Sequence, residues 1–318
     1  MYGGGWWEER SVAQCDRMVV MENQSPIGKY LNDYLSHLEV EKNRSIKTRE
    51  NYGRYLKVFI QDTRVKRPEE ITAEAVSNWR MKLARRPYKK VTQSYYIIAL
   101  RNFLKYLIKR DVKTLSPDKV ELPKVPARQI ETIRYQDLER MLGTPKAVTI
   151  KGMRDRAILE VLFSTGLRVA ELCALNRYAN LERGEITVRG KGEKLRVVFL
   201  SDRAKGALKE YLDKRGDAEE AMFVSYTKTK NQKVLGKITP RAVQRLVDKY
   251  ARQAGIGQRV HPHLIRHAFA TDLLINGADL RSVQEMLGHA NITTTQIYTH
   301  LTNKELREVH RAFHGRRR

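Results

Sequence analysis

The most informative part of this chain is residues 261–300, which read HPHLIRHAFATDLLINGADLRSVQEMLGHANITTTQIYTH. The pattern of apolar residues predicts helices over residues 264–276 and 279–287. His263 and Arg266 lie three residues apart, so a helix would place both side chains on one face.

Two further side chains capable of chemistry follow in the same stretch. His289 comes directly after Gly288, at the predicted end of the second helix, and Tyr298 lies in ITTTQIYTH. Taken singly, a histidine is more often a structural residue, and a tyrosine is more often a core aromatic. Other motifs of the chain have to support these residues before they indicate a function.

A second informative stretch lies earlier in the chain. Residues 155–175 are predicted to be helical, with an interruption at the Ser-Thr-Gly of residues 164–166. Arg168 follows this interruption at the start of VAELCAL, and Glu171 lies within it. Considered alone, Arg168 is as well suited to capping a helix or pairing with Glu171 as to binding a ligand.

Residues 185–200 read EITVRGKGEKLRVVFL and form a third motif. Alternating apolar residues lead into Gly190, Lys191 and Gly192, and apolar residues then return. This pattern predicts a β-hairpin with Lys191 at its tip. A lysine in a turn is by itself common.

The length of 318 residues suits two domains. Residues 25–111 have helical spacing throughout and predict a small domain of four helices. Prolines among charged residues predict an extended linker over residues 112–131. A second domain then covers residues 132–318, and residues 1–24 are expected to be a flexible extension, with Met21 as an alternative start of translation. Further helices are predicted over residues 202–214, 239–254 and 303–313. The expected fold is therefore mainly α with a small β-hairpin or sheet.

The charge of the chain points to a polyanionic partner. Lys and Arg number 61 against 36 Asp and Glu, which gives a net charge of +25. Such an excess favours nucleic acid, through phosphate neutralisation and counterion release, while a generally basic protein or one that binds membrane surfaces is the alternative. The basic residues on the polar faces of the first domain either contact DNA or are simply solvated: Lys42, Arg44, Lys47, Arg49, Lys89, Lys90 and Arg101.

Two other features bear on the cellular environment. The only cysteines are Cys15 and Cys173, which imply no disulfide framework and suit a reducing cytoplasm. No apolar run of the sequence approaches the length needed to span a bilayer.

The three motifs together resemble the tyrosine recombinase (phage-integrase-like) family. TGLRVAEL at residues 165–172, VRGKGEKLRVVFL at residues 188–200 and the stretch at residues 261–300 occur in the order of that family. They are most similar to its Xer branch. The resemblance implies a helical core-binding, SAM-like domain followed by an α-rich catalytic domain that together clasp duplex DNA. It also implies four protomers, of this chain or of a related recombinase, on two DNA sites.

The resemblance further implies a role for each matching residue. Tyr298 matches the nucleophile, and Arg168 and Arg266 match the two arginines that clamp the scissile phosphate. Lys191 matches the lysine that gives a proton to the leaving oxygen. The remaining positions are His263, His289 and the supporting acidic residue Glu171. No cofactor and no metal are expected.

The chemistry of these residue types agrees with that assignment. A free tyrosine has a pKa of about 10, so ionising it at neutral pH costs about 4 kcal/mol, and a base such as His263 lowers that cost during attack. Two guanidinium groups can stabilise the equatorial charge of a five-coordinate phosphorus. A covalent phosphotyrosine conserves the energy of the phosphodiester, so rejoining needs no ATP.

Zinc binding is the main alternative from another class of chemistry. His263 and His267 have the spacing of a zinc-binding helix, and His261 is close. However, Leu264 occupies the place of the glutamate in H-E-x-x-H, and Arg266 would repel a dication.

Three functions remain open at this point. The first is an Xer-like recombinase that resolves chromosome or plasmid dimers, and the second is the integrase of a phage or mobile element. The third is a DNA-binding protein without catalysis. In either recombinase, the helix around residues 305–313 is expected either to dock on a neighbouring protomer or to pack within its own.

Overall fold

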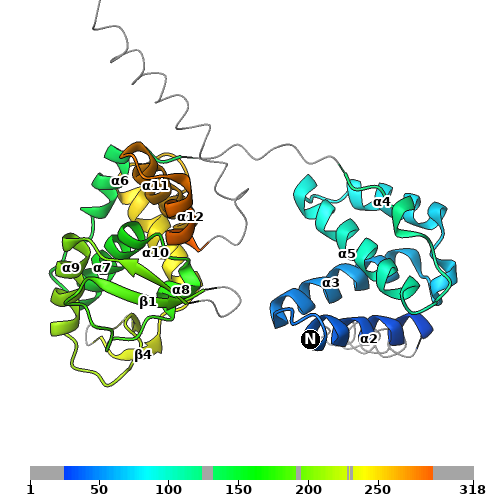
Figure 1. Ribbon diagram of the computed structural model, residues 1–318, viewed down its shortest axis with the longest axis horizontal. Coiled ribbons are helices and arrows are strands. Elements are labelled where there is room, and N and C mark those ends of the chain that lie inside the picture. The colour runs from blue at the N-terminus through cyan, green and yellow to red at the C-terminus, as the bar shows by residue number, and fades with distance from the viewer. Residues whose placement is uncertain (1–24, 124–131, 191–194, 228, 230–231, 289–318) are drawn as a thin grey trace, which may run out of the picture. The chain divides into compact units, whose positions relative to one another are not determined.

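The computed structural model describes residues 25–123, 132–190, 195–227, 229 and 232–288, and the chain divides into two compact units, Met1–Arg128 and Gln129–Arg318 (Figure 1). The described residues are mostly helical, with two small antiparallel sheets, so the predicted fold class is confirmed. Within these ranges, no helix is long and apolar enough to cross a membrane. The flexible extension predicted at residues 1–24 and the helix predicted at residues 303–313 lie outside the described residues.

The first unit is built from helices, and three of them have starts capped by a side chain. Its elements are α2 (Pro26–Val40), α3 (Ile46–Thr63), η1 (Pro68–Glu70), α4 (Ala73–Ala84), α5 (Lys90–Ile108) and η2 (Pro117–Lys119). The side chains of Ser25, Ser45 and Thr72 each accept a hydrogen bond from a backbone N–H in the first turn of the helix that follows. Each such cap stabilises its helix by about 1 kcal/mol.

The predicted apolar stripes form the core of this unit. Ile27, Leu31 and Leu100 are almost completely buried, as their helical spacing predicts. Phe59 of α3 meets Trp79 of α4 edge to face, with ring centroids 4.9 Å apart. Val120, which falls in the predicted linker, is fully buried in the same core. The beginning of that segment therefore packs on the first unit, and the limits of the linker stay a prediction.

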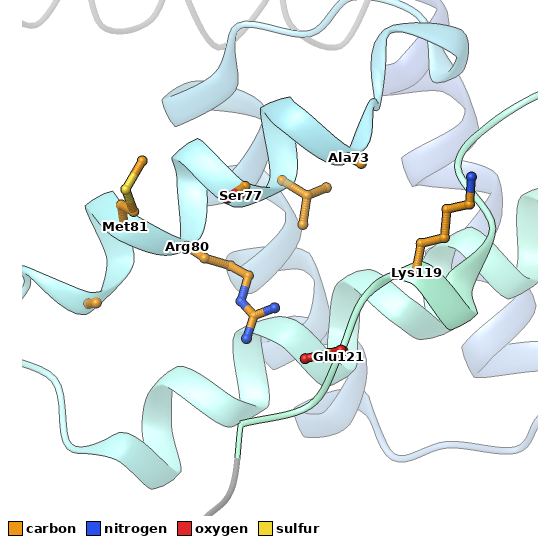
Figure 2. A pocket seen from close by; sticks show the side chains of 8 residues that line it. Ala73, Ser77, Arg80, Met81, Lys119 and Glu121 are labelled. Atoms are coloured by element: carbon orange, nitrogen blue, oxygen red, sulfur yellow. The ribbon is translucent and has the colours of Figure 1, made fainter.

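A hollow opens on the surface of the first unit beside α4 (Figure 2). Its lining comes from α4 and from the chain at and after η2: Ala73, Val76, Ser77, Arg80, Met81, Ala84, Lys119 and Glu121. None of the residues that the motifs single out lines it, so we do not place the chemistry there.

The second unit surrounds a central helix. Its helices are α6 (Tyr135–Leu142), α7 (Ile150–Thr165), α8 (Val169–Cys173), α9 (Asp202–Asp213), α10 (Pro240–Gln253), α11 (Pro262–Ile275) and α12 (Leu280–Leu287). Helix α7 contacts α9, α11, α8 and the strand at Leu195–Phe199, and most of its length is buried. The interruption predicted at residues 164–166 is therefore the end of this central helix.

The predicted hairpin is present as β1 (Glu185–Arg189) and β2 (Leu195–Phe199). The strands are antiparallel, with Ile186 opposite Val198 and Val188 opposite Arg196. A second sheet, which the sequence did not predict, pairs β3 (Val224–Tyr226) with β4 (Val234–Lys237). Its strands are too short for their apolar pattern to stand out.

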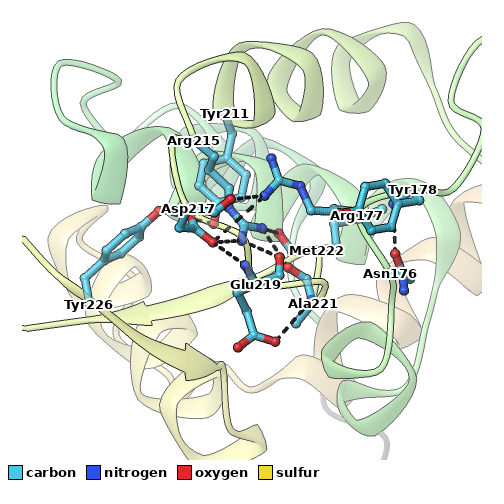
Figure 3. Close-up of polar contacts among 10 residues, drawn as sticks. All are labelled: Asn176, Arg177, Tyr178, Tyr211, Arg215, Asp217, Glu219, Ala221, Met222 and Tyr226. Atoms are coloured by element: carbon cyan, nitrogen blue, oxygen red, sulfur yellow. Dashed lines mark hydrogen bonds and ion pairs between the residues drawn. The ribbon is translucent and has the colours of Figure 1, made fainter.

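The side chain of Arg215 organises the loop between α9 and β3 (Figure 3). It is fully buried, and Nε donates to the Asp217 carboxylate at 2.9 Å. Its Nη atoms donate to the carbonyl oxygens of Glu219 at 2.8 Å, Ala221 at 2.6 Å and Met222 at 3.1 Å. One guanidinium thus satisfies three backbone acceptors and one carboxylate, and this ties the loop to the core.

Replacing Arg215 with methionine is expected to lower the free energy of unfolding by about 3 kcal/mol or more, because it leaves buried acceptors and Asp217 without a donor. Urea unfolding followed by circular dichroism measures this loss. The matched control is Lys214→Met, which removes the exposed lysine directly before Arg215. Its free energy of unfolding should stay within about 0.5 kcal/mol of that of the parent. Equal stability of the two variants would contradict the structural role of Arg215.

Candidate active site

The end of α7 turns sharply at Gly166. Its φ is +58°, in the left-handed region, and its N–H donates to the carbonyl of Leu162 at 3.1 Å. A Cβ at this position would lie 2.4 Å from Cδ1 of Phe269. Both the backbone conformation and the close approach therefore require glycine, and the turn places Arg168 at the start of α8.

Glu171 is the hub of the polar contacts at this turn. Its carboxylate accepts from the backbone N–H of Arg168 at 2.8 Å and from Nη1 of Arg168 at 2.9 Å. Arg196, which comes from β2, donates to the same carboxylate through Nη1 at 3.0 Å and Nη2 at 2.7 Å. Two arginines from different elements thus share one carboxylate that is 7% exposed.

This environment keeps Glu171 ionised. Burial by itself raises the pKa of Glu171. The hydrogen bonds from Arg196 and from the backbone and side chain of Arg168 outweigh burial and hold the pKa at about 2. The carboxylate therefore carries a full negative charge at neutral pH.

Arg266 links the ends of two helices. Its side chain is buried on α11, and Nη1 donates to the carbonyl of Gly166 at 2.5 Å. Its Nη2 donates to the carbonyl of Leu287 at 2.5 Å. The ends of α7 and α12 are thus held together by one guanidinium, which also meets the negative ends of both helix dipoles.

The other two arginines also reach the end of α12. Nε of Arg196 donates to the carbonyl of Met286 at 3.1 Å, and Nη2 of Arg168 donates to the carbonyl of Gly288 at 3.1 Å. Together with Arg266, three arginines therefore bind three successive carbonyls at a helix end. We call Arg168, Glu171, Arg196 and Arg266 the arginine cluster.

The cluster lies where the chain leaves α12. Gly288 ends this helix with a φ of +63°, and a Cβ there would lie 3.1 Å from Cδ of Arg196. His289 is the next residue in the sequence, and Tyr298 follows ten positions after Gly288. The cluster therefore holds the chain at the point from which the segment with His289 and Tyr298 departs.

His263 lies on the same helix as Arg266. It is exposed in the first turn of α11. Nδ1 of the neighbouring His261 accepts from the backbone N–H of Leu264 at 3.2 Å, so His261 caps the helix. Among the residues that the structure describes, no group of three or more His, Cys, Asp or Glu side chains is arranged to hold a metal ion.

The structure brings together part of the predicted site. Arg168, Glu171 and Arg266 converge on the ends of α7 and α12, and His263 lies three positions before Arg266. The predictions for Lys191, His289 and Tyr298 concern residues outside the described ranges.

Arg196 is the member of the cluster that sequence reasoning missed. In β2, Leu195, Val197 and Phe199 face outward and are 65%, 41% and 51% exposed, so Arg196 and Val198 face inward. An arginine at an inward position of a strand requires a buried acceptor. This was the signal available in the sequence, but it becomes clear only when the orientation of the strand is known.

Two family models match the chain. The phage integrase family matches residues 131–305, and the N-terminal SAM-like domain of phage integrases matches residues 31–111. This agrees with a helical unit followed by a unit with the arginine cluster. The chain belongs to the phage integrase family.

Sequence relatives show which branch of the family this chain resembles. Tyrosine recombinase XerC of Thermodesulfovibrio yellowstonii is 35% identical over 90% of this chain and 96% of its own length. XerC of Pelobacter propionicus is 36% identical over 92% of this chain and 97% of its own length. XerC of Escherichia coli O157:H7 is 36% identical over 89% of this chain and 95% of its own length. The chain is an Xer-like site-specific tyrosine recombinase.

Solved structures agree with the fold. The crystal structure of XerA recombinase covers 92% of this chain and 99% of its own, with a TM-score of 0.51 and 31% identity. The XerH recombinase bound to its difH substrate covers 84% of this chain and 80% of its own, with a TM-score of 0.64 and 23% identity. The second likeness is one of fold alone.

The lowered pKa of Glu171 makes its stabilising effect depend on pH. Glu171→Gln is expected to lower the free energy of unfolding at neutral pH by up to about 3 kcal/mol, from the drop in pKa from 4.5 to about 2. The pKa of Glu171 is lower in the folded protein than in the unfolded chain. This stabilisation is therefore present above pH 4.5 and is lost as the pH falls through 4.5 toward about 2. The difference in the free energy of unfolding between parent and variant should therefore decrease over this pH range.

Urea unfolding of both proteins at about pH 7, 5 and 3 measures the effect. The control is Glu182→Gln, which removes an exposed carboxylate in the turn before β1 and should follow the parent at each pH. A difference between Glu171→Gln and the parent that does not change with pH would contradict the assignment.

Proposed function

We propose that Tyr298 attacks a scissile phosphate in duplex DNA and forms a 3′-phosphotyrosyl intermediate, with Arg168 and Arg266 binding that phosphate. The observation that carries the proposal is the arginine cluster. Two arginines of the family motifs, far apart in the sequence, meet at the end of α12. The chain then continues from this point to Tyr298.

The cluster has the electrostatic properties that phosphoryl transfer needs. A five-coordinate phosphorus carries more negative charge on its equatorial oxygens than the ground state does. Guanidinium groups held by fixed carbonyl acceptors do not have to reorganise when that charge develops. Arg266 is held in this way by the carbonyls of Gly166 and Leu287, and Arg168 is held by the carbonyl of Gly288 and the carboxylate of Glu171.

We assign the two proton transfers of this reaction to Lys191 and His263, and a supporting place in the site to His289. In this scheme Lys191 protonates the departing 5′ oxygen, and the position at the hairpin tip that the sequence predicts for it suits this task. His263 takes the proton of Tyr298 during attack, which its exposed position on α11 permits. His289 completes the site beside the phosphate. The fixed cations supply the electrophilic charge, so the reaction should proceed with a chelator present.

At the level of the cell, we propose that the protein resolves chromosome or plasmid dimers in the cytoplasm. Four protomers, of this chain or with a related recombinase, would act on two DNA sites. Similarity to XerC over about nine-tenths of the chain supports this proposal. We also propose that residues 25–111 bind DNA and that residues 132–318 catalyse, with residues 112–131 as the connection.

An integrase of a mobile element would use the same chemistry. Mapping the covalent junction on genomic DNA separates the two roles. A single chromosomal site that is present without any mobile element supports dimer resolution, and junctions at the ends of a mobile element overturn it.

Tyr298→Phe should abolish covalent attachment to DNA and leave binding almost unchanged, because it removes only the nucleophilic oxygen. A suicide substrate nicked next to the cleavage position traps the adduct, which denaturing electrophoresis detects. Tyr178→Phe is the matched control, since Tyr178 is an exposed tyrosine in the same unit and should leave adduct formation intact. An adduct formed by the Tyr298→Phe protein, or none formed by the parent under conditions of proven specific binding, would disprove the assignment.

Binding to the recombination site should weaken steeply with salt, because a chain of net charge +25 releases many counterions from the phosphates it contacts. For six or more phosphate contacts, the affinity should fall by about a thousandfold or more between about 50 and 200 mM salt. Fluorescence anisotropy of labelled site DNA measures the slope, and Tyr298→Phe should share the slope of the parent. An affinity that changes little over this range would argue against a phosphate-dominated interface.

A further inference from the structure

Arg196 is a charged residue at an inward-facing position of the hairpin. Its side chain is 11% exposed, whereas that of Arg168 is 28% exposed. It contacts two other elements, since it donates to Glu171 of α8 and to the carbonyl of Met286 at the end of α12. The family motifs that led to Arg168 and Arg266 did not lead to Arg196, so its role needs an explanation of its own.

The charge balance of the cluster depends on this residue. Glu171 is ionised and lies 2.9 Å from Nη1 of Arg168. On their own, these two groups would sum to zero charge, and the carboxylate would cancel most of the attraction between Arg168 and a phosphate. With Arg196 on the same carboxylate at 2.7 Å, the three groups sum to one positive charge.

The geometry explains why an arginine is needed here. Its planar guanidinium donates through Nη1 and Nη2 to the two carboxylate oxygens of Glu171 and through Nε to the carbonyl of Met286. The side chain also packs against Gly288, where a Cβ would lie 3.1 Å from Cδ of Arg196. A lysine could keep the charge near Glu171, but it could not make all of these contacts at once.

We infer that Arg196 is a positioning residue of the recombination site, and that its charge offsets Glu171 so that the positive charge of Arg168 acts on the scissile phosphate. This inference rests on the proposed function of Arg168. In this arrangement Glu171 orients Arg168, Arg196 neutralises the excess negative charge, and the end of α12 is fixed by both arginines. Arg196 itself does not touch the phosphate.

The central test compares a single and a double variant by the rate of covalent trapping on a nicked suicide substrate at saturating DNA. Arg196→Met should slow trapping by about 100-fold, the lower end for losing one preorganised charge. Adding Glu171→Gln removes the carboxylate that Arg196 offsets, so the double variant should regain about tenfold or more over Arg196→Met alone. The affinity for DNA, measured separately, should change little in both.

A merely structural role of Arg196 gives the opposite result. In that case the second substitution would remove further contacts of the cluster, and the double variant would be as slow as Arg196→Met or slower. That outcome overturns the inference, as does a rate for Arg196→Met close to that of the parent. The matched control is Arg183→Met, which removes an exposed arginine in the turn before β1 and should leave the trapping rate at saturating DNA close to the parental value.

Two further measurements keep the test decisive. Arg196→Lys retains the charge beside Glu171, so it should form the covalent adduct faster than Arg196→Met. If Arg196→Met does not fold, the Arg196→Met, Glu171→Gln double variant is used in its place, because it leaves no unpaired carboxylate. Its trapping rate should then lie within about tenfold of that of Arg196→Lys. A double variant slower than that overturns the inference. Failure of the parent to form any adduct refutes the proposed function instead, because that result does not depend on Arg196.

Discussion

The site depends on one buried carboxylate that is bound by two arginines. Glu171 joins the turn after α7, where Arg168 begins α8, to the strand that carries Arg196. A buried carboxylate is stable only when its charge is compensated and its oxygen atoms accept hydrogen bonds, and both conditions are met here. Removing the carboxylate would leave two guanidinium groups close together, and removing either arginine would leave the charge of the other cancelled by Glu171. The three groups therefore act as one unit.

The second constraint is the use of helix ends as acceptors. The last carbonyls of an α-helix have no partner within the helix, and they form the negative end of its dipole. Here Met286, Leu287 and Gly288 each accept from an arginine, and Gly166 at the end of α7 accepts from Arg266. The acceptors that orient the cations are thus backbone atoms of helices packed in the core, and this rigid support suits a site that must stabilise charge without reorganising.

The net charge of the protein is a poorer guide to function than these contacts. Several arginines serve structure alone, such as Arg215 in its loop and Arg154, which donates to Asp155 and to the carbonyl of Val224. Three of the basic residues predicted to face DNA or solvent in the first unit are paired with acids, since Lys47 meets Glu50, Arg49 meets Glu39 and Arg101 meets Asp118. A positive excess therefore indicates a polyanionic partner, but it does not locate the surface that binds it.

The motifs pointed to the family by resemblance, while apolar periodicity and turn residues were sufficient to predict the mainly helical fold and the β1–β2 strands. These features are local, because apolar periodicity and turn residues act over a few positions, and the stripe of Ile27 and Leu31 is buried as its spacing requires. Only the tertiary structure decided how the charged groups meet. Arg168, Arg196 and Arg266 come from separate elements. Each donates to a different one of three successive backbone carbonyls, which carry no side-chain signal in a sequence. The role of Arg196 also depends on which face of β2 turns inward, and that orientation is set by packing against α7 and α12.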